Sequence, residues 1–187
     1  MKLLYPSYES SSAPDYETAV LVLNMVACCH PGRAEVFYHR GLSWAGMANG
    51  CWASPYTAKA LNDFAQALSF QPVYPEVYKA RAILVERRNP ERALADLGCL
   101  LSIQPTIDVY LYRAALLSRL ERYQLAFNDY VAALVRYITH CGADERAVCE
   151  RLLCQLNLEK DHGGGLLPAL ECLIQFWGER SMHHYQY

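Results

Sequence analysis

A four-position pattern recurs along this chain and constrains its fold more than any other feature of the sequence. A small residue is followed, at steps of four, three and five, by an aromatic or aliphatic residue, a small or aliphatic residue, and proline. The pattern occurs as Ala19, Leu23, Val26, Pro31; as Ala60, Phe64, Ala67, Pro72; as Ala93, Leu97, Leu100, Pro105; and as Ala126, Tyr130, Ala133, with Ile138 in the last place. Steps of four and three keep side chains on one face of an α-helix, and the proline ends that helix. Repetition at a period of 33 to 41 residues therefore predicts helical repeats that bury their apolar faces on one another.

A second pattern precedes three of these stripes, and it joins an aromatic residue, an arginine, a small residue and a larger apolar residue. Its members are Phe37, Arg40, Gly41, Trp44; Tyr78, Arg81, Ala82, Val85; and Tyr110, Arg113, Ala114, Leu117. Their spacing again describes one helical face. An aromatic ring beside a small residue suits the close crossing of two antiparallel helices. Each repeat is thus predicted to be a helical hairpin, with a first helix, helix A, followed by a second, helix B.

The two patterns together resemble the tetratricopeptide repeat. The resemblance covers residues 15–138, and more loosely the rest of the chain. It implies an all-α solenoid of helical hairpins, wound as a right-handed superhelix, in which the concave groove binds protein partners. The chain departs from the family in having arginine where helix A usually has leucine, and in a period of 33 rather than about 34 residues.

The chain is expected to divide into three parts: a flexible N-terminal leader at 1–14, a repeat array at 15–138, and a degenerate capping hairpin with a tail at 139–187. Asp15 is the expected N-cap of the first helix, which is a helix B with no helix A before it. The leader is one candidate to cover the face that this half repeat leaves open. The predicted complete hairpins span 34–71, 75–104 and 107–138. The capping hairpin is predicted to contain helices at 144–156 and 166–177, with the glycine run 163–165 as a loop and a frayed tail from Ser181 to Tyr187.

The 41-residue step between the first two stripes indicates an insertion, expected in a turn from Met47 to Thr57. Trp52 and Tyr56 fall in this segment. Loops often carry function and tryptophan is a frequent anchor of interfaces, so this inserted loop is one candidate contact site. An equally good interpretation is that the loop folds back over its own repeat.

Composition narrows the classes of function. The net charge is −2, without a basic stripe, which disfavours nucleic-acid binding. No apolar run reaches the length that spans a membrane. The eight cysteines form no CxxC pair and are interpreted as reduced thiols, which favours a cytoplasmic location, with a cytoskeletal or ciliary assembly as one possibility.

Three arginines and three aspartates stand at matching places in the complete hairpins. They are Arg40, Arg81 and Arg113 in helix A, and Asp63, Asp96 and Asp129 in helix B. The half repeat has no helix A and has Val22 in the place of the aspartate. This correlation predicts structural pairs, each arginine binding the aspartate of its own hairpin; ligand binding is the less favoured interpretation.

The family resemblance implies that one face of each helix A lines a partner-binding groove. The corresponding residues are Tyr38, His39 and Leu42; Lys79, Ile83 and Glu86; and Tyr112, Ala115 and Arg119. Aromatic and apolar groups flanked by mixed charge suit a bound peptide or helix. A clamp for C-terminal carboxylates, which some members of the family use, is not expected. Lys79 matches such a clamp, but Leu42, Ile83 and Ala115 replace its asparagines.

No pattern indicates catalysis, a metal or a cofactor. The histidines at 39, 140 and 162 lie in separate predicted elements, and no spacing sets a nucleophile beside a base. The expected function is therefore a non-catalytic adaptor that binds a protein or peptide in the groove. The alternative is a structural subunit built permanently into a large cytoplasmic assembly.

Overall fold

The computed structural model describes residues 15–49, 51–140, 142, 145–147, 149–152 and 166–183. Within these residues the secondary structure is helical, and no strand occurs. The all-α prediction is therefore confirmed for this part of the chain. The predicted leader, the glycine run and the last four residues of the tail lie outside the described residues.

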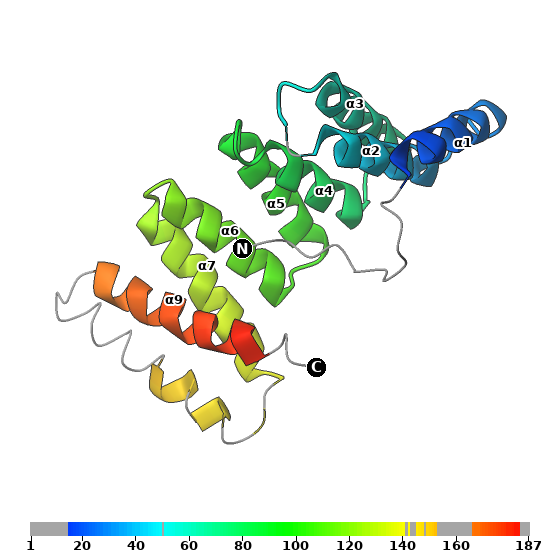
Figure 1. Cartoon of the computed structure of the whole chain (residues 1–187). Coiled ribbons are helices and arrows are strands. Elements are labelled where there is room, and N and C mark those ends of the chain that lie inside the picture. Colours follow the sequence, from blue (N-terminus) through cyan, green and yellow to red (C-terminus); the bar gives the residue numbers. More distant parts are fainter. Residues whose placement is uncertain are drawn as a thin grey trace. The chain divides into compact units, whose positions relative to one another are not determined.

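The chain divides into two compact units, Met1–Ala80 and Arg81–Tyr187. In the first unit, α1 (Tyr16–Cys29) packs against α2 (Ala34–Ala48), and α2 packs against α3 (Pro55–Phe70) (Figure 1). Helix α4 (Pro75–Val85) begins in the first unit and ends in the second.

The second unit continues with α5 (Pro90–Ile103), α6 (Ile107–Arg119), α7 (Tyr123–Ile138) and α9 (Leu166–His183). Helix α6 contacts both α5 and α7, and α7 also contacts α9. One apolar cluster joins α6, α7 and α9 and includes Leu134, Leu173 and the buried Cys149. Of the hairpins predicted from the two patterns, 34–71 corresponds to the contacting helices α2 and α3, and 107–138 corresponds to α6 and α7.

Local sequence explains where the helices begin and end. The carboxylate of Asp15 accepts a hydrogen bond from the backbone N–H of Thr18, so it caps α1 as predicted. Ser54 and Asn89 cap α3 and α5 in the same way, and each is followed by a proline in the first turn, where proline is tolerated. Helices α1, α3 and α5 all end two residues before the proline of the repeat pattern.

The predicted stripes form the core of the three complete hairpins. Buried stripe residues are Ala60, Phe64 and Ala67 in α3, Ala93, Leu97 and Leu100 in α5, and Ala126, Tyr130 and Ala133 in α7. In α1 the equivalent residues Ala19, Leu23 and Val26 are only half-buried. The half repeat is therefore covered on fewer sides than the complete hairpins.

The structure corrects two predictions, one about the segment from Met47 to Thr57 and one about the end of the last helix. The segment from Met47 to Thr57 is not one long turn, because α2 continues to Ala48 and α3 begins at Pro55. Part of the extra length lies in α2, which has 15 residues, against 11 in α4. The last helix, α9, runs to His183, beyond the predicted end at Trp177, so the first residues of the predicted frayed tail are helical. Of the helix predicted at 144–156, residues 145–147 and 149–152 are described, and they are helical.

Two glycines in helices are expected to respond oppositely to alanine. A methyl group at Gly41 would approach the ring of the buried Phe64 to 2.7 Å, whereas at Gly98 the nearest atom is 3.9 Å away. Gly98→Ala should raise the unfolding free energy by up to about 1 kcal/mol, through helix propensity. Gly41→Ala should lower it by about 1 kcal/mol, because overpacking outweighs that gain. Urea unfolding of both variants measures the difference, and an equal response would contradict the close crossing at Gly41.

Candidate interaction site

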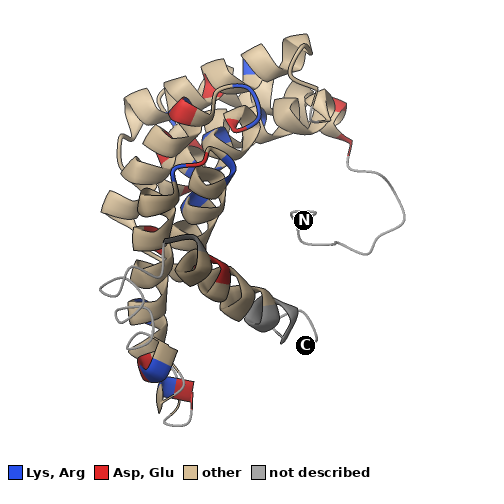
Figure 2. Ribbon diagram, turned by 90° about the vertical axis from the view of Figure 1, so that its left-hand side faces the viewer, with Lys and Arg blue, Asp and Glu red and all other residues tan. Residues whose placement is uncertain are grey.

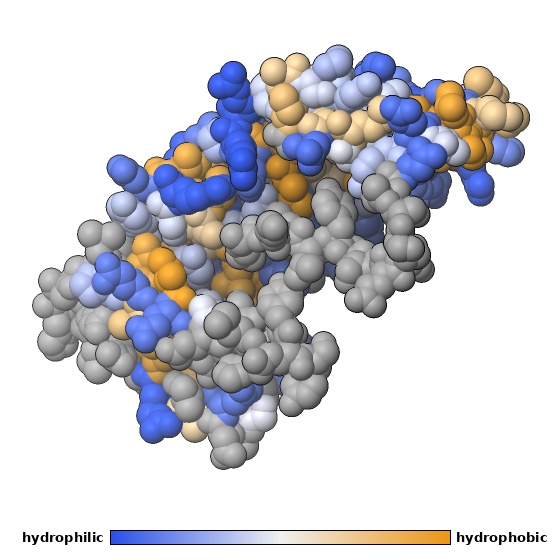
Figure 3. Space-filling view, viewed as in Figure 1, coloured by the Kyte–Doolittle hydropathy of each residue, from blue (hydrophilic) through white to orange (hydrophobic). Residues whose placement is uncertain are grey.

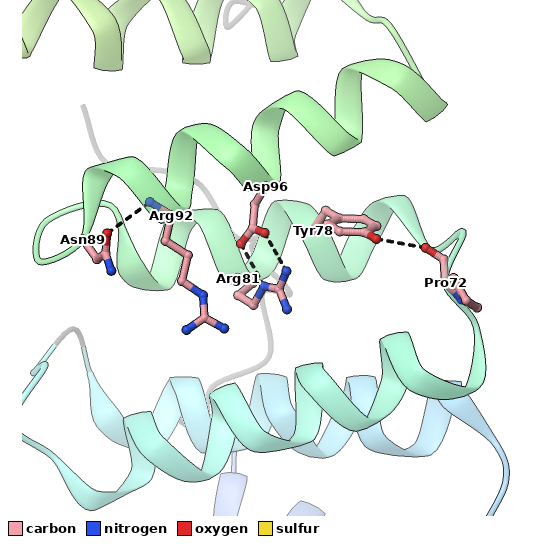
Figure 4. A network of polar contacts seen from close by, with 6 residues as sticks. All are labelled: Pro72, Tyr78, Arg81, Asn89, Arg92 and Asp96. Atoms are coloured by element: carbon pink, nitrogen blue, oxygen red, sulfur yellow. Dashed lines mark hydrogen bonds and ion pairs between the residues drawn. The ribbon is translucent and has the colours of Figure 1, made fainter.

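The arginines and aspartates that the repeat pattern pairs bind one another in all three complete hairpins. In each pair the Nε and Nη2 atoms of arginine donate to the two carboxylate oxygens of aspartate, at distances between 2.6 and 2.8 Å. Figure 4 shows this for Arg81 of α4 and Asp96 of α5, which face each other between the two helices. The aspartates are buried, while the arginines are partly exposed.

These pairs tie helix A to helix B. Two-point contact between a planar guanidinium and a carboxylate fixes direction as well as distance. Hydrogen bonding to Asp63 raises the pKa of Arg40, and hydrogen bonding to Asp129 does the same for the pKa of Arg113. Since both carboxylate oxygens of each aspartate are already bound, the pairs are better suited to hold the hairpins together than to bind a ligand.

The nine residues predicted to line a groove all lie at the surface or partly exposed. His39, Lys79, Ala115 and Arg119 are exposed, and the other five are half-buried. Eight of them belong to α2, α4 and α6, the first helices of the three complete hairpins, and Glu86 directly follows the end of α4. Tyr38, His39, Leu42 and Lys79 lie in the first unit, and the other five lie in the second.

In the first unit the predicted groove residues lie among aromatic rings. The ring of Tyr38 is 5.2 Å from that of Tyr74 and 6.4 Å from that of Phe64, between centroids. Burial raises the pKa of Tyr74. Tyr74 stands in the turn before α4 and belongs to neither sequence pattern, so nothing in the spacing pointed to it.

In the second unit the predicted groove residues of two successive first helices meet. The hydroxyl of Tyr112 in α6 donates a hydrogen bond to Glu86, which follows the end of α4. The same carboxylate forms an ion pair with Arg119, whose Nη2 lies 3.4 Å away. Burial, followed by the hydrogen bond to Glu86, raises the pKa of Tyr112, so its hydroxyl keeps its proton at neutral pH. The arrangement sets an aromatic ring, an anion and an exposed cation side by side.

The inserted segment contributes a small aromatic stack. The rings of Trp44 and Tyr56 lie parallel within 11°, 5.6 Å apart, and the ammonium group of Lys59 is 4.3 Å from the Trp44 ring centre. Because Tyr56 lies in α3 and Trp44 in α2, this stack is a contact between two helices and not a loop that folds back. Trp52 is exposed. The contact of Lys59 with these rings was not predicted. Lys59 lies three residues after Tyr56 on the same helix, a spacing at which two side chains are neighbours.

Positive and negative residues are interspersed along the described helices (Figure 2). Each of α2 to α7 contains both positive and negative residues. Within the described residues, no three His, Cys, Asp or Glu side chains gather as metal ligands would. The same part of the chain has no helix with the length and apolar character that crossing a membrane requires.

Comparison with known proteins adds no relative. No protein-family model matches the sequence, and no curated protein matches it.

Proposed function

We propose that this protein is a non-catalytic interaction module that binds a peptide or a helix of another protein along the exposed face of its first helices. In this proposal the hairpins continue one another as a tetratricopeptide-like solenoid in the cytoplasm. The observation that carries the proposal is the contact of Glu86 with Tyr112 and Arg119. These three residues of the second unit, which the resemblance assigns to the groove in successive repeats, are in contact with one another.

The chemistry of this surface suits a polypeptide. Tyr112 offers a ring that is largely held in place, and Arg119 offers a cation that remains exposed. Ala115 lies between them on α6 and leaves room for a side chain of the partner. Rigid helices that already present these groups lose little conformational entropy on binding, which favours affinity. Aromatic residues and arginine are also the types enriched at the energetic centres of interfaces.

A matched pair of variants tests the proposal. Peptides selected from a display library against the full chain are measured for affinity to Ala115→Arg and Ala95→Arg. Both alanines are exposed and lie within helices of the second unit, α6 and α5. The long arginine at 115 should weaken binding at least about tenfold, because it occupies the proposed surface. The same change at 95 should leave affinity within about twofold. Equal effects of the two variants, or no selectable peptide, would refute the proposal.

One observation favours the alternative of a structural subunit. In the described residues, the large apolar side chains that are exposed lie on second helices or in turns, and none lies on α2, α4 or α6. They are Leu21, Val22 and Met25 in α1, Phe70 in α3, Leu125 and Val135 in α7, Ile174 in α9, and Trp52 and Val73 in turns. A subunit held in an assembly through its second helices would have this distribution. Full affinity in Ala115→Arg, with assembly lost in variants of the second helices, would favour the alternative.

A further inference from the structure

Two neighbouring segments of the second unit, 86–92 between α4 and α5 and 119–122 between α6 and α7, are rich in arginine. Their arginines, all exposed, are Arg87, Arg88 and Arg92 in the first segment and Arg119 and Arg122 in the second. Each arginine of the second segment forms an ion pair with a glutamate of the first, Glu86 or Glu91. The two segments, called the arginine turns below, therefore lie side by side. Figure 3 shows strongly hydrophilic residues, in deep blue, over the turn between α4 and α5.

The three arginines of the first segment have no partner among the residues that the structure describes. Arg87, Arg88 and Arg92 form no side-chain hydrogen bond or ion pair there. In Figure 4 the side chain of Arg92 extends away from α5, and the hydrogen bond drawn for this residue joins its backbone N–H to the side chain of Asn89. Three guanidinium groups thus keep all their donors free within a short stretch of chain.

Free guanidinium groups at this spacing specify an anion that carries more than one charge. A guanidinium binds a carboxylate or a phosphoryl group through two parallel N–H···O bonds. One exposed pair with a carboxylate stabilises little, because both groups are well hydrated and salt screens their attraction. A phosphoryl group on a side chain has nearly two negative charges and three acceptor oxygens, so it can bind two guanidinium groups at once. Arginines 87, 88 and 92 are close enough along the chain to act together in this way.

The charge of the rest of the chain favours a short ligand. Five of the 17 Lys and Arg residues and three of the 19 Asp and Glu residues lie in the arginine turns, which leaves 12 positive and 16 negative residues elsewhere. A nucleic acid or an anionic membrane would extend beyond the turns and meet this excess of negative charge. A phosphorylated peptide segment needs to contact only the turns.

We propose that the arginine turns bind a phosphorylated segment of a partner polypeptide, with Arg87, Arg88 and Arg92 donating hydrogen bonds to the phosphoryl oxygens. This inference goes beyond the function proposed above and does not rest on it. Neither Tyr112 nor Ala115 supplies a group to this site, and the variants described below leave both residues unchanged.

Three fluorescein-labelled peptides and two triple variants test the proposal. The peptides share a neutral Gly/Ser sequence and carry at two positions phosphoserine, glutamate or unmodified serine. Fluorescence anisotropy measures their affinity for the full wild-type chain in low salt. One variant combines Arg87→Gln, Arg88→Gln and Arg92→Gln. The matched control changes three exposed arginines outside the turns: Arg33→Gln, Arg146→Gln and Arg151→Gln. Both variants lower the net charge equally, so they separate a local site from the attraction of the whole chain.

The wild-type chain should bind the phosphoserine peptide at least about tenfold more tightly than the glutamate peptide, because one phosphoryl group binds two guanidinium groups. The variant in the arginine turns should weaken binding of the phosphoserine peptide at least about tenfold, and the control should stay within about twofold of wild type. Circular dichroism should give the same spectrum and thermal midpoint for all three proteins, because the replaced side chains are exposed.

Four results would overturn the proposal. One is that the wild-type chain does not bind the phosphoserine peptide, which is also expected if another part of the polypeptide covers these arginines. Another is equal affinity for the phosphoserine and glutamate peptides. A third is an equal loss in the two triple variants, which would make the effect one of net charge. The last is tighter binding of an oligothymidylate or of anionic lipid vesicles that is lost in the variant of the arginine turns, which would assign the site to a different class of ligand.

Discussion

Replacing Phe64 by alanine should lower the free energy of unfolding by about 3–5 kcal/mol. The ring of Phe64 is fully buried in α3 and lies directly against Gly41 of α2. Glycine has no side chain that could move into the space left by the ring, and the neighbouring helix backbones are held by their own hydrogen bonds. The cavity would therefore remain largely unfilled, which is the condition for the upper part of this range. Urea denaturation followed by circular dichroism measures the loss.

Phe70→Ala is the matched control for this prediction. Phe70 lies on the same helix, loses the same atoms, and is 48% exposed beside the ring of Phe37. Its replacement should cost about 1 kcal/mol or less, because much of its surface is already in water. If the two variants lost equal stability, the crossing of α2 and α3 at Gly41 would not be the packed core described above.

Replacing Asp96 by alanine should lower the free energy of unfolding by about 3 kcal/mol or more. Asp96 is 3% exposed and accepts two hydrogen bonds from the guanidinium of Arg81, whose side chain is 14% exposed. The variant keeps the positive charge in a place with little access to water and removes the carboxylate that compensates it. Chemical denaturation measures the loss, and a value near zero would show that this pair adds nothing to stability.

A double variant separates the cost of an uncompensated charge from the value of the pair itself. Arg81→Met combined with Asp96→Leu removes both charges and keeps most of the buried volume. Its stability should lie much closer to wild type than that of Asp96→Ala, because buried ion pairs exchanged for apolar residues are often neutral in energy. A double variant as unstable as Asp96→Ala would mean that lost packing, and not the charge, explains the single variant.

Much of the local structure could be predicted from the repeat alone. Proline at a constant distance after each stripe predicted the ends of α1, α3 and α5, because it cannot continue a helix. The three ion pairs were predicted because the arginine and the aspartate are either both present in a repeat or both missing from it. Residues that occur together in this way are expected to be in contact. The candidate surface on α4 and α6 was predicted only through the family resemblance, and it stays a prediction.

Predictions were wrong where the pattern has no end signal. No proline follows Trp177, and α9 continues to His183. The insertion before Pro55 was expected to form a loop, yet much of the segment extends α2 and begins α3. Extra residues that favour the helix can lengthen it without disturbing the stripe that packs against the next helix, so sequence spacing does not distinguish a longer helix from a longer turn.

The helical segments, the apolar face of each helix and the paired charges could be predicted from the sequence, because they depend on residues three to four positions apart and on their repetition along the chain. Which apolar faces are covered depends instead on how the helices pack. The stripe of α1 has the same residue pattern as the stripes of α3, α5 and α7, yet an outer face of α1 is exposed. Burial of that face depends on whether another helix lies against it. Tyr74 beside Tyr38, and Tyr56 stacked on Trp44, likewise follow from how the helices pack, which spacing along one helix does not encode.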